Sequence, residues 1–127
     1  MRIGIIGTGR IASRFVDTAF EGIESAYVSC VYNPKMESAE KFAIQHRIEN
    51  YTDNLEELSM LADAVYIASP HETHYEYSKY FLSNKKHVLC EKPAALSKTQ
   101  AEELYTLAKE NNVVFMEAVK TAYCPGF

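Results

Sequence analysis

The chain lacks two features that would place it outside a reducing cell interior: a disulfide framework and a long apolar stretch. Its cysteines, Cys30, Cys90 and Cys124, are odd in number and lie in or beside apolar segments, which is typical of buried, reduced thiols. No apolar run approaches the ~18 residues of a membrane span. Because Met1 leads straight into an apolar strand pattern, we expect no signal peptide and a cytoplasmic protein.

An excess of basic residues is also missing. The 127 residues include 13 Lys and Arg against 17 Asp and Glu, which gives a net charge of −4. Since the lysines are scattered, neither nucleic acid nor an acidic membrane surface is expected as a partner. The chain has no repeat and no low-complexity linker, and its length suits one domain that buries its own core.

What the sequence does contain is an unbroken alternation of strand and helix patterns. The predicted strands are Ile3–Gly7, Tyr27–Tyr32, Ile48–Tyr51, Ala64–Ala68, His87–Cys90 and Val113–Ala118. The predicted helices are Arg10–Phe20, Lys35–Gln45, a turn from Asp53 through Leu58, Glu72–Leu82, and a helix that Ser97 opens and Asn111-Asn112 close. This alternation predicts an α/β fold with a doubly wound parallel sheet, the Rossmann fold, in strand order 3-2-1-4-5-6.

Local signals mark the ends and the inward faces of these helices. Gly22 is expected to end the first helix and Asp53 to cap the third, while Ser97 and Gln100 form a capping box. The inward residues predicted by helical spacing are Ile11, Phe15, Val16, Ala19 and Phe20 in the first helix, and Ala39, Phe42 and Ala43 in the second.

The most informative stretch is Gly7-x-Gly9-x-x-Ala12, which follows the first strand and opens the first helix. Gly7 permits a sharp turn, Gly9 removes a side chain where a pyrophosphate touches backbone, and Ala12 lets the helix lie close to the strand. The helix N-terminus adds unpaired N–H groups, and the loop has no acidic residue. The pattern predicts a dinucleotide site at Gly7, Thr8, Gly9, Arg10 and Ile11. The alternative is a tight turn that needs small residues.

Two further clusters end the fourth and fifth predicted strands. Ser69-Pro70-His71-x-x-His74 follows one, and Glu91-Lys92-Pro93 follows the other. Both fall at the carboxyl edge of the sheet, beside the reversal of strand order where ligands bind. The spacing of His71 and His74 could place two imidazoles on one helix face, but no further ligands stand out, so no metal site is expected.

Together with Gly7-Thr8-Gly9-Arg10-Ile11-Ala12, these clusters resemble the glucose–fructose oxidoreductase and inositol dehydrogenase (Gfo/Idh/MocA) family over the whole chain. The Glu-Lys-Pro triplet is the most specific element, and Met116-Glu117-Ala118 with Pro125 is similar to the dihydrodiol dehydrogenase branch. The resemblance implies an NAD(P)-dependent oxidoreductase that acts on a CH–OH group of a sugar, polyol or related compound.

In that family the lysine of the triplet is catalytic, so the resemblance gives this role to Lys92. A positioned amine or ammonium can hold the alkoxide that develops as hydride leaves carbon; the alternative is a solvated loop lysine. The resemblance also implies a cis bond before Pro93, and it places Glu91 near the nicotinamide ribose, although a plain strand-end carboxylate is the other interpretation. His71 stands where the family usually has Asn, which leaves its cofactor contact open. His74 matches a family position, which makes it a candidate cofactor-binding residue that orders the loop rather than performs chemistry.

The end of the second strand bears on the choice of cofactor. An acidic residue there would bind the adenosine ribose of NAD and repel a 2′-phosphate, but the chain has Asn33-Pro34-Lys35. Asn33 can still bond a ribose hydroxyl, and Lys35 either meets a 2′-phosphate or faces solvent. The sequence therefore favours NADP over NAD.

Family members continue into a second domain that binds substrate and often mediates oligomers. We therefore interpret residues 1–127 as the NAD(P)-binding Rossmann domain of a longer protein that forms a homo-oligomer and acts on a small hydroxyl or carbonyl compound. Two other interpretations remain: a non-catalytic dinucleotide-sensing regulator and a stand-alone binding module. Lys92 favours the enzyme over the sensor, since a sensor needs no positioned amine.

Overall fold

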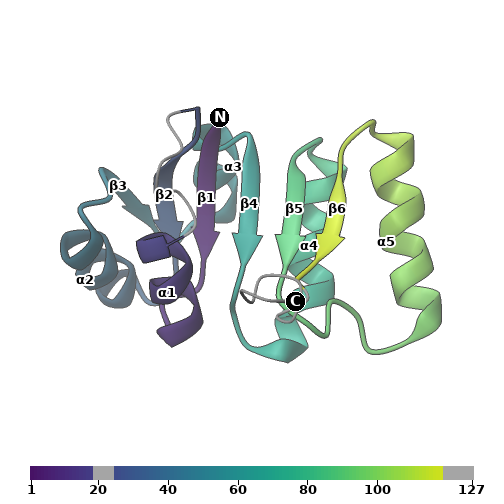
Figure 1. Cartoon of the computed structure of the whole chain (residues 1–127), viewed down its shortest axis with the longest axis horizontal. Coiled ribbons are helices and arrows are strands. Elements are labelled where there is room, and N and C mark those ends of the chain that lie inside the picture. Colours follow the sequence, from purple (N-terminus) through teal and green to yellow (C-terminus); the bar gives the residue numbers. More distant parts are fainter. Residues whose placement is uncertain (19–24, 119–127) are drawn as a thin grey trace, which may run out of the picture.

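The computed structural model describes residues 1–18 and 25–118, which form a six-stranded sheet with helices on both faces (Figure 1). Its strands are β1 (Arg2–Ile6), β2 (Tyr27–Tyr32), β3 (Asn50–Thr52), β4 (Ala64–Ile67), β5 (His87–Cys90) and β6 (Phe115–Glu117). Every neighbouring pair is parallel, and the order is β3-β2-β1-β4-β5-β6. The predicted Rossmann topology is confirmed.

The helices divide between the two faces of the sheet. They are α1 (Arg10–Thr18), α2 (Met36–His46), α3 (Leu55–Leu61), α4 (His74–Ser83) and α5 (Lys98–Glu110), with a 3₁₀ turn, η1 (His71–Thr73), before α4. Buried side chains of α1 and α2 belong to one core cluster, and those of α3, α4 and α5 belong to another. This is the doubly wound arrangement, in which right-handed crossovers cover each face in turn.

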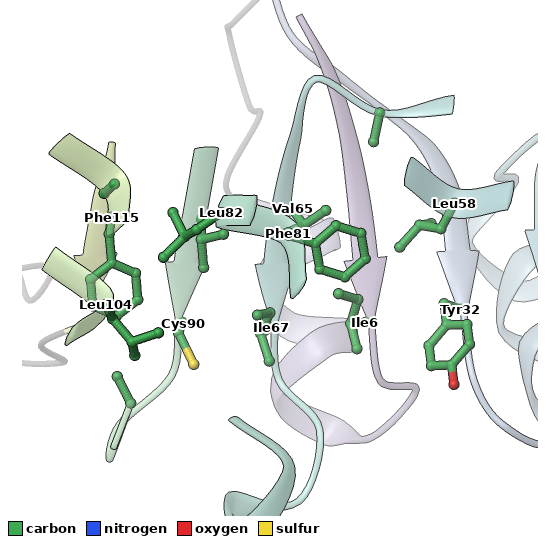
Figure 2. Close-up of a cluster of buried hydrophobic side chains, with 14 of the residues drawn as sticks. Ile6, Tyr32, Leu58, Val65, Ile67, Phe81, Leu82, Cys90, Leu104 and Phe115 are labelled. Atoms are coloured by element: carbon green, nitrogen blue, oxygen red, sulfur yellow. The ribbon is translucent and has the colours of Figure 1, made fainter. Parts of the chain in front are cut away.

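The larger cluster lies between the sheet and α3, α4 and α5 (Figure 2). Figure 2 shows Leu104 and Phe115 at one end of the cluster and Tyr32 at the other. Phe81 and Leu104 are fully buried. Burying a side chain of this size stabilises the fold by about 1.5–3 kcal/mol, so this layer supplies much of the rigidity of the strand ends.

The smaller cluster lies between the sheet and helices α1 and α2. It confirms the predicted inward face of α2 and differs from the predicted inward face of α1. Ala39, Phe42 and Ala43 are buried, as the helical spacing predicted. The prediction for Ile11 was wrong, because this side chain is 54% exposed and Ala12 is buried instead. Successive residues of a helix lie about 100° apart, so with Ala12 packed in the core the side chain of Ile11 faces solvent. Ala19, Phe20 and Gly22 lie outside the described residues.

Two helix starts differ from the prediction. The cap of α3 is Asn54 rather than Asp53, since the helix begins one residue later and Asn54 Oδ1 accepts a hydrogen bond from Glu57 N at 3.0 Å. The helix also runs on to Leu61, which packs against the larger cluster. The segment predicted to begin as helix at Glu72 starts with the turn η1.

The capping box of α5 is present in a shifted form. Ser97 Oγ accepts from Gln100 N at 3.2 Å, as predicted, but Gln100 Oε1 accepts from Leu96 N at 3.1 Å rather than from Ser97 N. These two bonds tie Leu96 and Ser97 to the first turn of α5, which fixes the end of the loop that follows β5.

Cys30 and Cys90 are free, buried thiols, and burial raises the pKa of each to about 12. Cys124 lies outside the described residues. Within residues 1–18 and 25–118, no helix combines the length and apolarity needed to cross a membrane. The same residues contain no group of three or more His, Cys, Asp or Glu side chains placed to hold a metal ion.

The amino edge of the sheet carries an ion pair that joins β1 to the start of β4. Arg2 donates to Asp63 from its backbone N at 2.8 Å and from its guanidinium at 3.1 Å. These bonds from Arg2 hold the pKa of the Asp63 carboxyl at about 2, below its ordinary 3.8. The predicted functional residues follow the opposite, carboxyl ends of the strands.

Candidate functional site

The predicted site residues lie on loops that leave the same edge of the sheet. In Figure 1 the arrowheads of β1, β4, β5 and β6 point toward this edge, at the bottom of the view. Backbone hydrogen bonds between neighbouring strands continue one residue past the strand ends. Gly7 N donates to Tyr32 O at 3.0 Å, and Glu91 N donates to Ile67 O at 2.9 Å. The first residues of these loops are therefore held by the sheet itself, and the loops after β1, β4 and β5 are neighbours in the order of the strands.

Gly7 is where the first loop meets the loop after β4. Its φ is +112°, a conformation that residues with a Cβ rarely adopt. A Cβ at this position would also lie only 2.7 Å from the carbonyl oxygen of Ala68. Only glycine therefore lets the chain turn off β1 while it stays against the end of β4.

Gly9 differs from Gly7 because it faces open space. A Cβ built on Gly9 would meet no atom within 4 Å. Ser13 N donates to Gly9 O at 3.0 Å, which is the first bond of α1, so the amides of the residues before Ser13 have no partner inside the helix. The first turn of α1 has no acidic residue, and Arg10 is exposed. The loop is thus a cradle of N–H donors at a positive helix end, the arrangement that binds phosphate.

Asn33 ties the end of β2 to this glycine loop. Its Nδ2 donates to Thr8 Oγ1 at 3.0 Å, and its Oδ1 accepts from Lys35 N at 2.8 Å. Lys35 is exposed, precedes α2, and makes no side-chain hydrogen bond or ion pair with any described residue. The end of β2 therefore presents an amide and a free ammonium beside the cradle, with no carboxylate in the segment Asn33-Pro34-Lys35.

Glu91 is held by a tyrosine that sequence reasoning did not single out. Tyr66 Oη donates to Glu91 Oε2 at 2.7 Å, which joins β4 to the first residue after β5. The Tyr66 ring stacks on Phe15 of α1 with 3.7 Å between ring centroids. The carboxylate is thereby fixed relative to both the sheet and the helix that begins at the glycine loop. An aromatic residue next to the end of an aliphatic strand was the available signal.

Lys92 is exposed, and its ammonium makes no hydrogen bond or ion pair with any residue in the described ranges. The peptide bond between Lys92 and Pro93 is cis, as the resemblance implied. Ala94 N donates to Glu117 Oε2 at 2.8 Å, so β6 anchors the loop on the far side of Lys92. Glu117 was quoted in the sequence motif, but its anchoring role was missed. The result is an exposed amine on a loop that is fixed before and after it.

The two histidines after β4 occupy different environments. His71 is exposed in η1 next to Pro70, whereas the side chain of His74 is buried under the loops. His74 Nε2 lies 2.7 Å from Ser69 O, and Nδ1 lies 3.0 Å from Pro93 O. His74 therefore touches the loops after β4 and β5 from inside and has no surface open to a ligand. Among Ser69, Pro70, His71 and His74, the first three are at least partly exposed to solvent, and His74 is buried.

Comparison with known proteins agrees with this architecture. The sequence pattern of the oxidoreductase family with an NAD-binding Rossmann fold matches residues 1–119. The scyllo-inositol 2-dehydrogenase (NADP(+)) of Bacillus subtilis (strain 168) is 43% identical over 100% of this chain and 39% of its own length. The trans-1,2-dihydrobenzene-1,2-diol dehydrogenase of Xenopus laevis is 35% identical over 96% of this chain and 38% of its own length.

Solved structures give the same result. A 3-ketoreductase from Actinomadura kijaniata, in complex with NADP and TDP-benzene, superposes with a TM-score of 0.89 at 29% identity. The match covers 99% of this chain and 39% of that chain. The chain thus spans about 39% of the length of the first relatives that it matches. With its glycine cradle, its strand order and a family match over residues 1–119, the chain belongs to the Gfo/Idh/MocA oxidoreductase family, in its NAD-binding Rossmann fold.

Proposed function

We propose that this chain is the dinucleotide-binding domain of an NAD(P)-dependent oxidoreductase that acts on a CH–OH group of a sugar, polyol or related compound. The observation that carries the proposal is the glycine cradle at Gly9 together with the exposed amine of Lys92, because both follow the carboxyl ends of strands in the same sheet. The cradle suits a pyrophosphate, and an amine at the same edge suits proton and charge transfer at a hydroxyl. The curated relatives support it, because they include dehydrogenases of inositol and of glucose 6-phosphate.

The residues present fit a nicotinamide dinucleotide. Backbone amides of the loop Gly7, Thr8, Gly9, Arg10 and Ile11 would bind the pyrophosphate, and the α1 N-terminus would add its positive end. Asn33 and Lys35 would face the adenosine ribose, Ser69, Pro70 and His71 would line the middle, and Glu91 would meet the nicotinamide ribose. When bound, the cofactor accepts or supplies the hydride.

NADP is the preferred cofactor in this proposal. The segment after β2 offers Lys35 with a free ammonium and no acidic side chain to repel a 2′-phosphate. The name of the Bacillus subtilis relative specifies NADP(+), and the Actinomadura kijaniata 3-ketoreductase was solved with NADP. Lys35 would bind the 2′-phosphate through a charge-assisted hydrogen bond.

Lys92 is the catalytic residue of the proposal. Its ammonium would hold the substrate oxygen, stabilise the alkoxide as hydride leaves carbon, and polarise the carbonyl in the reverse direction. The contacts of Tyr66 with Glu91 and of Glu117 with Ala94 keep the backbone on both sides of Lys92 in place. Catalysis gains from such pre-organisation, because less motion has to be frozen when substrate arrives.

The proposal includes a second domain, outside this chain, that closes the other side of the cleft and binds the substrate. The chain matches about 39% of the length of its relatives, which leaves room for such a domain. We propose a homo-oligomer assembled through that domain. We place the protein in the cytoplasm, where the free thiols of Cys30 and Cys90 stay reduced.

The test is turnover of the intact protein with a panel of polyols, including scyllo-inositol, and NADP. Lys92→Met should lower turnover by about 10² or more, the usual loss for an acid–base group, and leave dinucleotide affinity unchanged. Lys109→Met, an exposed lysine in the last turn of α5, is the matched control and should retain full turnover. Undiminished turnover of Lys92→Met would contradict the catalytic proposal and favour the dinucleotide sensor.

A further inference from the structure

His74 has an arrangement of partners that a neutral imidazole cannot satisfy. Its ring is almost fully buried, and each nitrogen faces a backbone carbonyl oxygen: Nε2 faces Ser69 O at 2.7 Å and Nδ1 faces Pro93 O at 3.0 Å. A carbonyl oxygen only accepts hydrogen bonds, and a neutral imidazole carries one N–H donor. Both contacts are therefore hydrogen bonds only when both ring nitrogens carry a proton.

The two carbonyls belong to the two loops that flank the proposed site. Ser69 follows β4, and its hydroxyl bonds Thr73 Oγ1 at 2.7 Å, so this carbonyl is part of an ordered turn. Pro93 directly follows Lys92. The ring of His74, at the first residue of α4, thus spans the space beneath both loops and fixes the distance between them.

We propose that His74, in its doubly protonated form, is a positioning residue that holds the Lys92 loop at its working distance from the loop after β4. The proposal rests on the function proposed above for Lys92. His74 touches neither substrate nor cofactor, because its side chain is buried, and it acts only through the backbone at Ser69 and Pro93.

Ionisable side chains adjoin His74 and one of its carbonyl partners. His71 lies in η1, just before α4 begins at His74, and Glu91 and Lys92 precede Pro93 in the loop after β5. The His71 ring lies 5.5 Å away between centroids. Hydrogen bonds from a doubly protonated ring to two carbonyl oxygens are charge-assisted, and they are shorter and stronger than those of a neutral donor.

Loss of that proton would break one of the two bonds. The bare nitrogen would then direct its lone pair at a carbonyl oxygen 2.7 or 3.0 Å away, and the two loops would move apart to relieve the repulsion. Lys92 would lose its fixed position while the cradle at Gly9, on another loop, stayed intact. A defect in His74 therefore affects the chemical step more than dinucleotide binding.

The first test reads the protonation state directly and does not depend on turnover. Long-range ¹H–¹⁵N spectra of the chain labelled at histidine should show both His74 nitrogens as protonated at neutral pH. The exposed His71 provides an internal reference in the same spectra. A single protonated nitrogen on His74 at neutral pH would overturn the proposal.

The second test separates positioning from stability in the intact protein. His74→Phe fills the space without donors and should lower kcat about tenfold or more, with dinucleotide Kd changed less than twofold. His74→Gln, which supplies one donor group, should retain more turnover than His74→Phe. Ser78→Ala removes a buried polar group one turn along the same helix and is the matched control, with kcat unchanged. If His74→Phe does not fold, His74→Gln and the spectra decide.

The outcomes distinguish this proposal from the one on which it rests. If Lys92→Met loses turnover while both His74 variants keep full kcat, the positioning role is wrong and the catalytic role of Lys92 stands. If Lys92→Met keeps full turnover, the proposed function itself is wrong. A fall in dinucleotide affinity as large as the fall in kcat in His74→Phe would show a general structural role instead and would also overturn the proposal.

Discussion

Alanine substitutions at the two glycines of the first loop should have different effects: Gly7→Ala should lower the stability of the fold, and Gly9→Ala should lower dinucleotide affinity. At Gly7 the positive φ of +112° and the 2.7 Å approach of a Cβ to Ala68 O both oppose a side chain. A strained backbone conformation costs about 1–3 kcal/mol, and relief of the clash by a shift of β4 adds to this. We therefore expect Gly7→Ala to destabilise the chain by about 2–4 kcal/mol out of a typical 5–15 kcal/mol.

At Gly9 the same substitution should leave the fold intact. A Cβ there meets nothing within 4 Å, and the backbone is not in the positive-φ region that disfavours side chains. Gly9→Ala should stay within about 0.5 kcal/mol of the parent chain in unfolding free energy. The methyl group would instead occupy the cradle, so dinucleotide affinity should fall at least tenfold, or about 1.4 kcal/mol.

The assays are urea unfolding followed by circular dichroism and titration with NADPH followed by nicotinamide fluorescence. The predicted loss in Gly7→Ala corresponds to a fall in Tm of about 8–16 °C at about 4 °C per kcal/mol for a domain of this size. The two variants serve as controls for each other, because they add the same methyl group two residues apart. A Gly7→Ala chain as stable as the parent, or a Gly9→Ala chain that binds NADPH as tightly, would refute the reasoning.

Two other substitutions test charges at opposite edges of the sheet. Lys35→Ala should weaken NADP binding by about 1.5–3 kcal/mol and leave NAD binding unchanged. The control is Lys41→Ala, at an exposed lysine of α2, which should alter neither affinity. Equal losses of affinity for both cofactors by calorimetry would show that Lys35 does not bind the 2′-phosphate. Arg2 holds the pKa of Asp63 at about 2, below its ordinary 3.8, so the stabilising effect of Asp63 is complete well above pH 3.8 and is lost as the pH falls through about 2. Asp63→Asn should therefore be less stable than the parent chain at pH 6, and most of that difference should be gone at about pH 2 in urea unfolding. A constant difference at both pH values would be the contrary result.

The topology could be predicted because each crossover leaves a local signal. The glycine loop, the apolar strands and the inward faces at Ala39, Phe42 and Ala43 all depend on neighbours close in sequence. The same periodicity misplaced Ile11, because Ile11 and Ala12 are adjacent in the first turn of α1 and only Ala12 packs into the core. Asp53 and Asn54 are both good caps, and the choice between them depends on one residue of helix register.

The supports of the site could not be predicted, because they link residues far apart in sequence. Tyr66 reaches Glu91 from β4, Glu117 reaches Ala94 from β6, and His74 joins Ser69 to Pro93 from α4. Each contact depends on how two elements are aligned along the strand direction and on a side-chain rotamer. No pattern of neighbouring residues in the sequence encodes either. The sequence could name Lys92 through a resemblance, but it could not show how the loop around Lys92 is fixed.

The central claim is that the loop after β1 binds a nicotinamide dinucleotide. The most direct measurement is a titration of this chain with NADPH and with NADH, followed by nicotinamide fluorescence and calorimetry. Saturable binding of at least one, lost in Gly9→Asp because a carboxylate enters the pyrophosphate position, is the predicted result. No binding of either dinucleotide at millimolar concentrations, by a chain shown to be folded, would contradict the account.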